Sequence, residues 1–256
     1  MKPLLIVQTG HAPDRIRARL DDFAHWFRLG LRLPPARLRV VDVQAGEALP
    51  PPRMCAGAVI TGSAAMVTDR ERWSEDTAGW IRSAMDAELP LFGVCYGHQL
   101  MAHALGGRVD VLPGGREIGD RNVSLTAAGS GHPLLRGLPP VWPAHHTHLQ
   151  AVLEPPPTAS VLATSVRDPH QMLGYAPRVV STQFHPEFSA AIMRAYIDRR
   201  VALLRSEGLD VPALLRGVGA APQARTLLRR FARSIGSADA AAAASEPPAR
   251  RRAAGR

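Results

Sequence analysis

The sequence contains few cysteines and no long apolar run. Cys55 and Cys95 are the only cysteines among its 256 residues, which excludes a disulfide framework and, without an export signal, indicates two reduced thiols. No apolar run approaches the roughly 18 to 20 residues that a membrane-spanning helix needs. The apolar stretch after Met1 is also too short for the core of a signal peptide. These absences predict a cytoplasmic protein that does not associate with membranes.

Lysine is almost absent, because Lys2 is the only one in the chain. Arginine therefore carries nearly all of the positive charge, which fits a genomic codon bias as well as selection for phosphate binding. The formal net charge is +9; residues 1–200 hold 21 basic and 18 acidic side chains, a net of +3, and residues 201–256 hold 10 and 4, a net of +6. The excess lies mostly in the C-terminal segment, so nucleic acid is not an expected partner of the main part of the chain.

Short apolar runs alternate with segments of helical periodicity through the first hundred residues. The apolar runs are Leu4–Val7, Leu38–Val43, Ala58–Ile60 and Leu89–Val94, and the amphipathic segments are Asp14–Leu29 and Trp73–Ala87. Strands that alternate with helices favour an α/β fold with an open, mostly parallel central sheet and helices on both faces.

The second half of the chain changes in character. Frequent Gly and Pro with short alternating segments between about residues 108 and 160 predict a small antiparallel insertion. A β pattern returns in Val161–Thr164 and Val179–Phe184, and a helix is expected over Pro186–Arg200. We expect a main domain at residues 1–204, a helical C-terminal extension at 205–235 and, because of its alanine run and arginine-rich end, a disordered basic tail at 236–256.

Cys95 lies in the most informative segment, Gly93-Val94-Cys95-Tyr96-Gly97, between a predicted strand and a predicted helix. This is the cysteine form of a nucleophile elbow, in which flanking glycines let the backbone turn tightly around a strained nucleophile. The turn places the thiol at the carboxyl edge of the sheet and near a helix N-terminus, which favours the reactive thiolate. Cys55 lacks any such surroundings, and we interpret it as a buried structural residue.

A nucleophilic cysteine needs a base and a group that orients the base. The segment Gln183-Phe184-His185-Pro186-Glu187 supplies both. In extended backbone, residues two apart project to the same side, so His185 and Glu187 can face one site. A carboxylate beside one imidazole nitrogen fixes the tautomer and leaves the other nitrogen for the thiol.

These two segments match both motifs of class I glutamine amidotransferase domains, and about residues 1–200 resemble this family, in particular stand-alone proteins similar to the amidotransferase domain of GMP synthase. The resemblance implies a flavodoxin-like sheet, Cys95 as nucleophile, His185 as general base and acid, and Glu187 as its orienting carboxylate. It further implies that the backbone N–H groups of Gly62 and Tyr96 form an oxyanion hole.

The same resemblance implies the residues that contact substrate. Gln99 resembles a substrate-contacting glutamine of the family, and the segment Thr147-His148-Leu149 resembles one whose backbone helps to hold the α-amino and α-carboxyl groups. One departure concerns the loop after Gly62, where many relatives carry Gly-Gly-Pro or a proline and this chain has Ser63-Ala64-Ala65. No proline stiffens that loop here, so its sequence does not account for a rigid conformation.

The histidines at 145, 146 and 148 also raise the alternative of a metal site. On an extended strand His146 and His148 share one face while His145 does not, and no carboxylate or cysteine nearby in the sequence completes a tetrahedral set. We therefore expect no metal, and no other cofactor.

The resemblance implies hydrolysis of the side-chain amide of L-glutamine to glutamate and ammonia, with the ammonia acceptor handled by a separate synthase partner. The sequence contains no Ser-Gly-Gly-x-Asp-Ser loop and no Gly-x-x-x-x-Gly-Lys-Ser/Thr loop, so ATP is not expected to bind. Three alternatives stay open: a γ-glutamyl peptidase or hydrolase with the same three residues, a noncatalytic binding module that docks through residues 205–235, and nucleic-acid binding through the basic tail.

Overall fold

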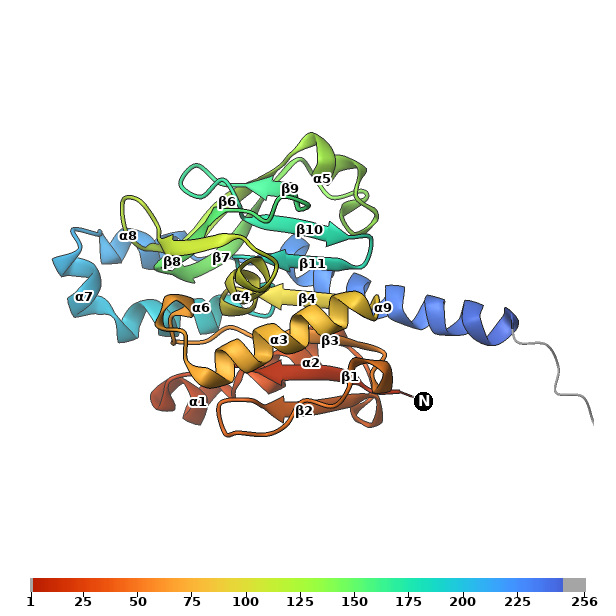
Figure 1. Cartoon of the computed structure of the whole chain (residues 1–256). Helices are drawn as coiled ribbons and strands as arrows, with labels where there is room; N and C mark the ends of the chain where they lie inside the picture. Colours follow the sequence, from red (N-terminus) through yellow and green to blue (C-terminus); the bar gives the residue numbers. More distant parts are fainter. Residues whose placement is uncertain (1, 246–256) are drawn as a thin grey trace, which may run out of the picture.

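The computed structural model describes the backbone of residues 2–245 and the side chains of residues 2–235. Its main feature is a nine-stranded sheet in the order β2-β1-β3-β4-β11-β10-β9-β6-β7 (Figure 1). The first five strands in this order are mutually parallel. They are β2 (Leu38–Asp42), β1 (Leu4–Gln8), β3 (Gly57–Ile60), β4 (Leu91–Val94) and β11 (Val179–Thr182).

The other four strands run antiparallel to their neighbours. They are β10 (Met172–Ala176), β9 (Ser160–Thr164), β6 (Glu117–Leu125) and β7 (Val141–His148). A separate two-stranded sheet pairs β5 (Arg108–Val111) with β8 (Gln150–Glu154). The predicted antiparallel insertion therefore does not stand apart, because two of its strands, β6 and β7, extend the central sheet.

Helices cover both faces of the sheet, as predicted. In Figure 1, α3 and α4 lie in front of the strands and α2 and α9 lie behind them. The helices are α1 (Asp14–Leu20), α2 (Phe23–Leu31), α3 (Arg72–Asp86), α4 (Tyr96–Ala104), α5 (Ala127–Gly131), α6 (Ala190–Arg199), α7 (Val201–Ser206), α8 (Val211–Gly217) and α9 (Pro222–Ser245). Short 3₁₀ turns occur at Pro35–Arg37, Pro52–Met54, Val67–Asp69 and Pro133–Leu135. None of the described helices is long and apolar enough to cross a membrane.

Two predicted helices differ in the structure. The segment expected as one helix over Asp14–Leu29 is two helices, α1 and α2, because Asp21 has a φ of 66° and Asp22 caps the N-terminus of α2. A side-chain oxygen that binds a free backbone N–H stabilises a helix start at that position. The helix expected from Pro186 begins instead at Ala190, after Ser189 caps it.

The C-terminal helix α9 is part of the core. Leu227, Leu228 and Phe231 are buried. The centroid of the Phe231 ring lies 5.4 Å from that of the Phe92 ring in β4. The helix continues to Ser245, so residues 236–245, which we expected to be disordered, are helical. Alanine has the highest intrinsic helix propensity, which explains why the alanine run extends the helix. The remainder of the predicted tail, residues 246–256, lies outside the described residues.

His11 joins the ends of three elements at the carboxyl edge of the sheet, although no sequence pattern assigned it a role. Its Nδ1 lies 2.6 Å from Asp22 Oδ2 at the start of α2, and its Nε2 lies 2.8 Å from Asp42 Oδ2 at the end of β2. The two carboxylates favour the imidazolium form, in which each ring nitrogen can donate to one of them. The Gln8 amide nitrogen also lies 2.9 Å from Nδ1. The hydrogen bond to Asp22, together with the charges of both carboxylates, raises the pKa of His11.

Replacing His11 with glutamine is therefore expected to destabilise the protein more at about pH 6 than at about pH 9. Because the pKa is higher in the folded state, the ion pairs contribute fully below the ordinary value of 6.5, and the contribution is lost as pH rises through the folded-state pKa. The measurement is the free energy of unfolding from urea titrations. His25→Gln is the matched control, because His25 faces a single carboxylate, Asp21, at 3.7 Å on an exposed surface. An equal loss at both pH values in His11→Gln would contradict the prediction.

Candidate active site

Cys95 occupies a strained turn between β4 and α4. It has a φ of 52° and a ψ of −100°, a backbone conformation that costs a non-glycine residue about 1–3 kcal/mol and that clusters at functional sites. Two backbone hydrogen bonds hold the turn, from Cys95 N–H to the carbonyl of Thr182 at 2.8 Å and from Gln99 N–H to the carbonyl of Cys95 at 3.0 Å. The sharp elbow predicted from the sequence is therefore present.

The two flanking glycines are required by close packing rather than by unusual torsion angles. A Cβ on Gly93 would lie 2.6 Å from the carbonyl oxygen of Gly97, and a Cβ on Gly97 would lie 2.5 Å from the carbonyl oxygen of Ile60. Such contacts with backbone atoms leave no room for a side chain at either position. The residue with a positive φ is Cys95 itself, and neither flanking glycine has one.

His185 and Glu187 follow β11, the strand next to β4. The parallel register pairs Thr182 with Val94, so the residues just beyond both strands meet at one edge of the sheet. His185 Nδ1 lies 2.7 Å from Glu187 Oε1, and both side chains are buried. The Phe188 ring stacks on the imidazole with 4.1 Å between ring centroids. Glu187 and Phe188 together fix the orientation of the His185 ring.

The charges near His185 favour its protonated form. Burial opposes a charge on the imidazole, yet the Glu187 carboxylate and the Cys95 sulfur raise the pKa of His185 to about 10. Within the described residues, His185 Nε2 has no hydrogen-bond partner of normal geometry. The structure therefore leaves this nitrogen available on the side of the ring opposite Glu187.

Gly62 lies beside both Cys95 and His185. A Cβ on Gly62 would sit 3.1 Å from His185 Cε1 and 3.6 Å from Cys95 Cβ. In the part of the chain that the structure describes, the backbone N–H groups of Gly62 and Tyr96 donate to no other group. Two free N–H donors beside a thiol have the composition of an oxyanion hole.

Thr9, which the sequence did not single out, anchors the loop that carries Gly62. Its backbone N–H donates to Thr61 Oγ1 at 3.0 Å, and its hydroxyl donates to the carbonyls of Thr61 at 2.9 Å and Gly62 at 3.2 Å. These buried bonds come from the end of the neighbouring strand β1. They hold Thr61 and Gly62 in place, although no proline follows in Ser63-Ala64-Ala65.

The residues predicted to contact substrate line the same cleft as Cys95. The cleft is lined by Ser63, Ala64, Ala65, Met66, Cys95, Tyr96, Gln99, Arg116, Thr147, His148, Leu149, Gln150 and Arg200. The Gln99 amide donates to the Gln150 carbonyl at 2.7 Å and to Gln183 Oε1 at 3.0 Å. Arg116 and Arg200 were missed, because no sequence pattern separates them from the other arginines.

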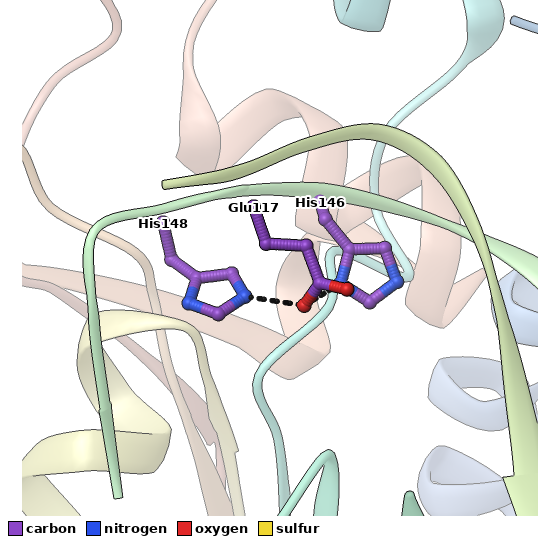
Figure 2. Close-up of side chains that lie close together, drawn as sticks. All are labelled: Glu117, His146 and His148. Atoms are coloured by element: carbon purple, nitrogen blue, oxygen red, sulfur yellow. Dashed lines mark hydrogen bonds and ion pairs between the residues drawn. The ribbon is translucent and has the colours of Figure 1, made fainter. Parts of the chain in front are cut away.

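The histidines of β7 do have a carboxylate neighbour, which corrects our expectation. Because β6 pairs antiparallel with β7, Glu117 lies opposite His148, and Figure 2 shows its carboxylate between the rings of His146 and His148. Glu117 Oε2 lies 3.0 Å from His148 Nε2 and 3.6 Å from His146 Nδ1. All three side chains are buried and could hold a metal ion.

Hydrogen bonds account for Glu117 and His148 as a buried pair, whereas both ring nitrogens of His146 have no hydrogen-bond partner among the described residues. His148 lies between two acceptors, the Gln150 carbonyl at 2.9 Å and the Glu117 carboxylate, so both of its nitrogens must donate. Gln171 Nε2 also donates to Glu117, at 2.8 Å. Although burial acts to raise it, the hydrogen bond from His148 and the nearby imidazoles hold the pKa of Glu117 at about 2. The expectation of no bound metal stays a prediction.

Comparison with solved structures finds the same fold. A glutamine amidotransferase from Thermotoga maritima superposes with a TM-score of 0.73 at 20% identity, covering 92% of this chain and 98% of that one. A glutamine amidotransferase from Methylobacillus flagellatus gives a TM-score of 0.67 at 22% identity, covering 92% and 93%.

Sequence comparison is more specific. The chain is 36% identical over 144 residues to the glutamine-hydrolysing GMP synthase of Aeropyrum pernix, covering 56% of this chain and 25% of that protein. It is 28% identical over 149 residues to gamma-glutamyl peptidase 5 of Arabidopsis thaliana, covering 57% and 59%. The chain therefore spans about a quarter of the GMP synthase and under two thirds of the peptidase.

The model of the glutamine amidotransferase class-I family matches residues 39–201. Since this match includes more than half of the chain, the protein belongs to the class I glutamine amidotransferase family.

Proposed function

We propose that this protein hydrolyses the side-chain amide of L-glutamine through a thioester on Cys95. The observation that carries the proposal is the convergence of Cys95, the His185–Glu187 pair and Gly62 at one edge of the sheet. A strained thiol, an oriented imidazole and free backbone donors are the parts that acyl transfer requires.

The reaction follows from these positions. The Cys95 thiolate attacks the amide carbon, and the N–H groups of Gly62 and Tyr96 stabilise the resulting oxyanion, each donor contributing typically about 2.7–4 kcal/mol in the transition state. Protonated His185 gives its proton to the departing nitrogen, so ammonia leaves and a γ-glutamyl thioester remains. His185, now neutral, takes a proton from water as the water attacks the thioester. Glutamate leaves and the thiol is restored.

The destination of the ammonia is the second part of the proposal. The chain matches a quarter of a GMP synthase, and it lacks the Ser-Gly-Gly-x-Asp-Ser loop for ATP. We infer that a separate synthase partner activates the acceptor. We also propose residues 1–204 as the amidotransferase domain and residues 205–235 as a helical extension, whose helix α9 packs on the central sheet.

A γ-glutamyl peptidase or hydrolase activity is the second candidate, and the similarity to gamma-glutamyl peptidase 5 favours it. The chemistry at Cys95 is unchanged, and only the departing amine differs. A noncatalytic module is less well supported, because it gives no reason for the strain at Cys95. The proposed docking segment, moreover, buries its apolar face against this chain's own core.

A steady-state assay of the full chain tests the proposal. With L-glutamine and γ-glutamyl amides offered in parallel, glutamate release is expected from at least one of them, and the ratio of kcat/KM values decides between the two activities. Adding candidate synthase partners tests for a protein that stimulates release. No glutamate from any γ-glutamyl substrate, with or without a partner, would contradict the proposal.

A further inference from the structure

A second histidine–carboxylate pair lies outside the reacting groups. Asp120 and His145 are opposite each other in the antiparallel pairing of β6 with β7, and opposite residues in such a pair project to the same face of the sheet. His145 Nδ1 donates to Asp120 Oδ1 at 2.7 Å, and the two side chains are only 1% and 11% exposed. The reaction proposed above uses neither of them. What the pair holds in place follows from its other contacts.

The pair holds the backbone of the proposed general base. The backbone N–H of His185 donates to the carbonyl of His145 at 2.9 Å. Residue 145 is thus fixed by Asp120 at its side chain and by His185 at its carbonyl. The other imidazole nitrogen of His145, Nε2, is buried and has no hydrogen-bond partner among the described residues. His145 therefore acts on His185 through the backbone and not along a hydrogen bond between the two rings.

The C-terminal extension supplies the next contact of this pair. Gly219, between α8 and α9, donates its backbone N–H to Asp120 Oδ2 at 2.7 Å. The preceding carbonyl, that of Val218, accepts from Nη2 of Arg194 in α6. Both carboxylate oxygens of Asp120 are therefore used, one by β7 and one by a residue 99 positions later in the chain. A continuous path of hydrogen bonds runs from the extension to the general base.

We propose that Asp120 and His145 are positioning residues for His185, and that the backbone N–H of Gly219 sets their orientation, so that the C-terminal extension completes the geometry of the active site. The inference rests on the proposed function and gives the extension a role in it. A general base must lie within about 2.6–3.2 Å of the atom whose proton it takes, and a misplacement of about 1 Å can reduce a rate about a hundredfold. The hydrogen bonds from Gly219 to His185 limit such a displacement.

Asp120→Asn tests the carboxylate. An amide has only one acceptor atom at its end, so it cannot accept from both Gly219 and His145 as the carboxylate does. We expect kcat with the preferred γ-glutamyl substrate to fall about tenfold or more, and KM to stay within about twofold of wild type, since the residues that line the cleft are unchanged. A lower thermal unfolding midpoint with a wild-type kcat below that midpoint would indicate a structural role alone and overturn the inference.

Gly219→Pro and Gly219→Ala form a matched pair that leaves every charge in place. Proline removes the N–H donated to Asp120, and Val218, with a φ of −71° and a ψ of 113°, lies outside the helical region that a following proline disfavours. Alanine keeps the N–H, and its Cβ would lie 3.7 Å from Asp120 Oδ2, an ordinary contact. We expect kcat to fall about tenfold in Gly219→Pro and to stay within about twofold of wild type in Gly219→Ala. This pair decides if Asp120→Asn fails to fold, and equal kcat values in the two variants would overturn the inference.

Alkylation of Cys95 by iodoacetamide measures the same geometry without a substrate. A protonated imidazole beside the sulfur favours the thiolate, so a displaced His185 lowers the alkylation rate at about pH 7, followed by mass spectrometry of the peptide that contains Cys95. We expect Asp120→Asn and Gly219→Pro to react more slowly than wild type and Gly219→Ala to match it. If the wild type releases no glutamate but these differences in alkylation are observed, the proposed reaction fails and the positioning role stands. Turnover in the wild type, with equal kcat values and equal alkylation rates in all variants, would overturn the positioning role and leave the reaction.

Discussion

Replacing Cys95 with alanine is expected to reduce glutamate release at least about a thousandfold, the scale on which loss of a nucleophile acts in enzymes of this kind. The fold should survive, because alanine keeps the Cβ and the backbone hydrogen bonds of the elbow do not involve the thiol. The measurement is kcat with the preferred γ-glutamyl substrate, together with the thermal unfolding midpoint. A wild-type rate in Cys95→Ala would exclude Cys95 as the nucleophile.

Cys55→Ala is the matched control, because it removes the only other thiol. Cys55 is buried in a different hydrophobic cluster from Cys95. Its Sγ lies 3.8 Å from the carbonyl of Pro51, and burial raises the pKa of its thiol. A protonated, buried thiol is a poor nucleophile. We expect kcat within about twofold of wild type, since the thiol takes no part in the chemistry. A comparable loss in both variants would indicate that general disruption, and not chemistry, explains the Cys95 result.

His185→Asn is expected to have the second largest effect, also about a thousandfold or more on kcat. Asparagine retains polar atoms near Glu187, but it cannot deliver a proton to the leaving nitrogen or accept one from water. Single-turnover measurements should show that formation of the thioester itself is slowed. Rapid thioester formation in this variant would contradict the assignment of His185 as the acid.

Glu187→Gln tests the cause of the raised pKa at His185. The carboxylate favours the imidazolium, so its removal should lower the pKa of His185 from about 10. In the proposed mechanism the protonated form gives its proton to the departing nitrogen, so activity is expected to fall as pH rises through this pKa. The basic limb of the kcat/KM profile should therefore move to lower pH in Glu187→Gln. A basic limb that stays in place would mean that another group sets it.

The parallel strands and the elbow could be predicted because their signals are local. A short apolar run followed by Gly-x-Cys-x-Gly needs only neighbouring residues to be interpreted. A Cβ added to the glycines at 93 and 97 would lie as close as 2.5 Å to backbone atoms. His185 and Glu187 are also neighbours in sequence. Their approach to Cys95 followed from the rule that parallel strands end at the same edge.

The other contacts of the site depend on strand pairing and helix packing between segments that are distant in the sequence. Glu117 reaches His148 only because β6 pairs with β7 in one particular register. Arg200 reaches the cleft through the packing of α6, and an arginine at the end of an amphipathic helix is ordinarily a solvated residue. Thr9 holds the loop that follows β3, and His11 contacts carboxylates at the end of β2 and at the start of α2. Each of these residues gains its role from an element distant in the chain.

The position of β11 in the sheet has a consequence for the order in which the protein can assemble. β11 is the last described strand in sequence, yet it lies between β4 and β10 and is the only strand that joins the parallel half of the sheet to the antiparallel half. During synthesis, backbone hydrogen bonds cannot join the strands of the two halves until residue 182 has emerged. The elbow of Cys95 also takes one of its two backbone hydrogen bonds from Thr182. A nascent chain therefore has neither this hydrogen bond of the elbow nor the proposed base, His185, until nearly all of the proposed domain has been made, and we expect the thiol to gain its reactivity only when the sheet is complete.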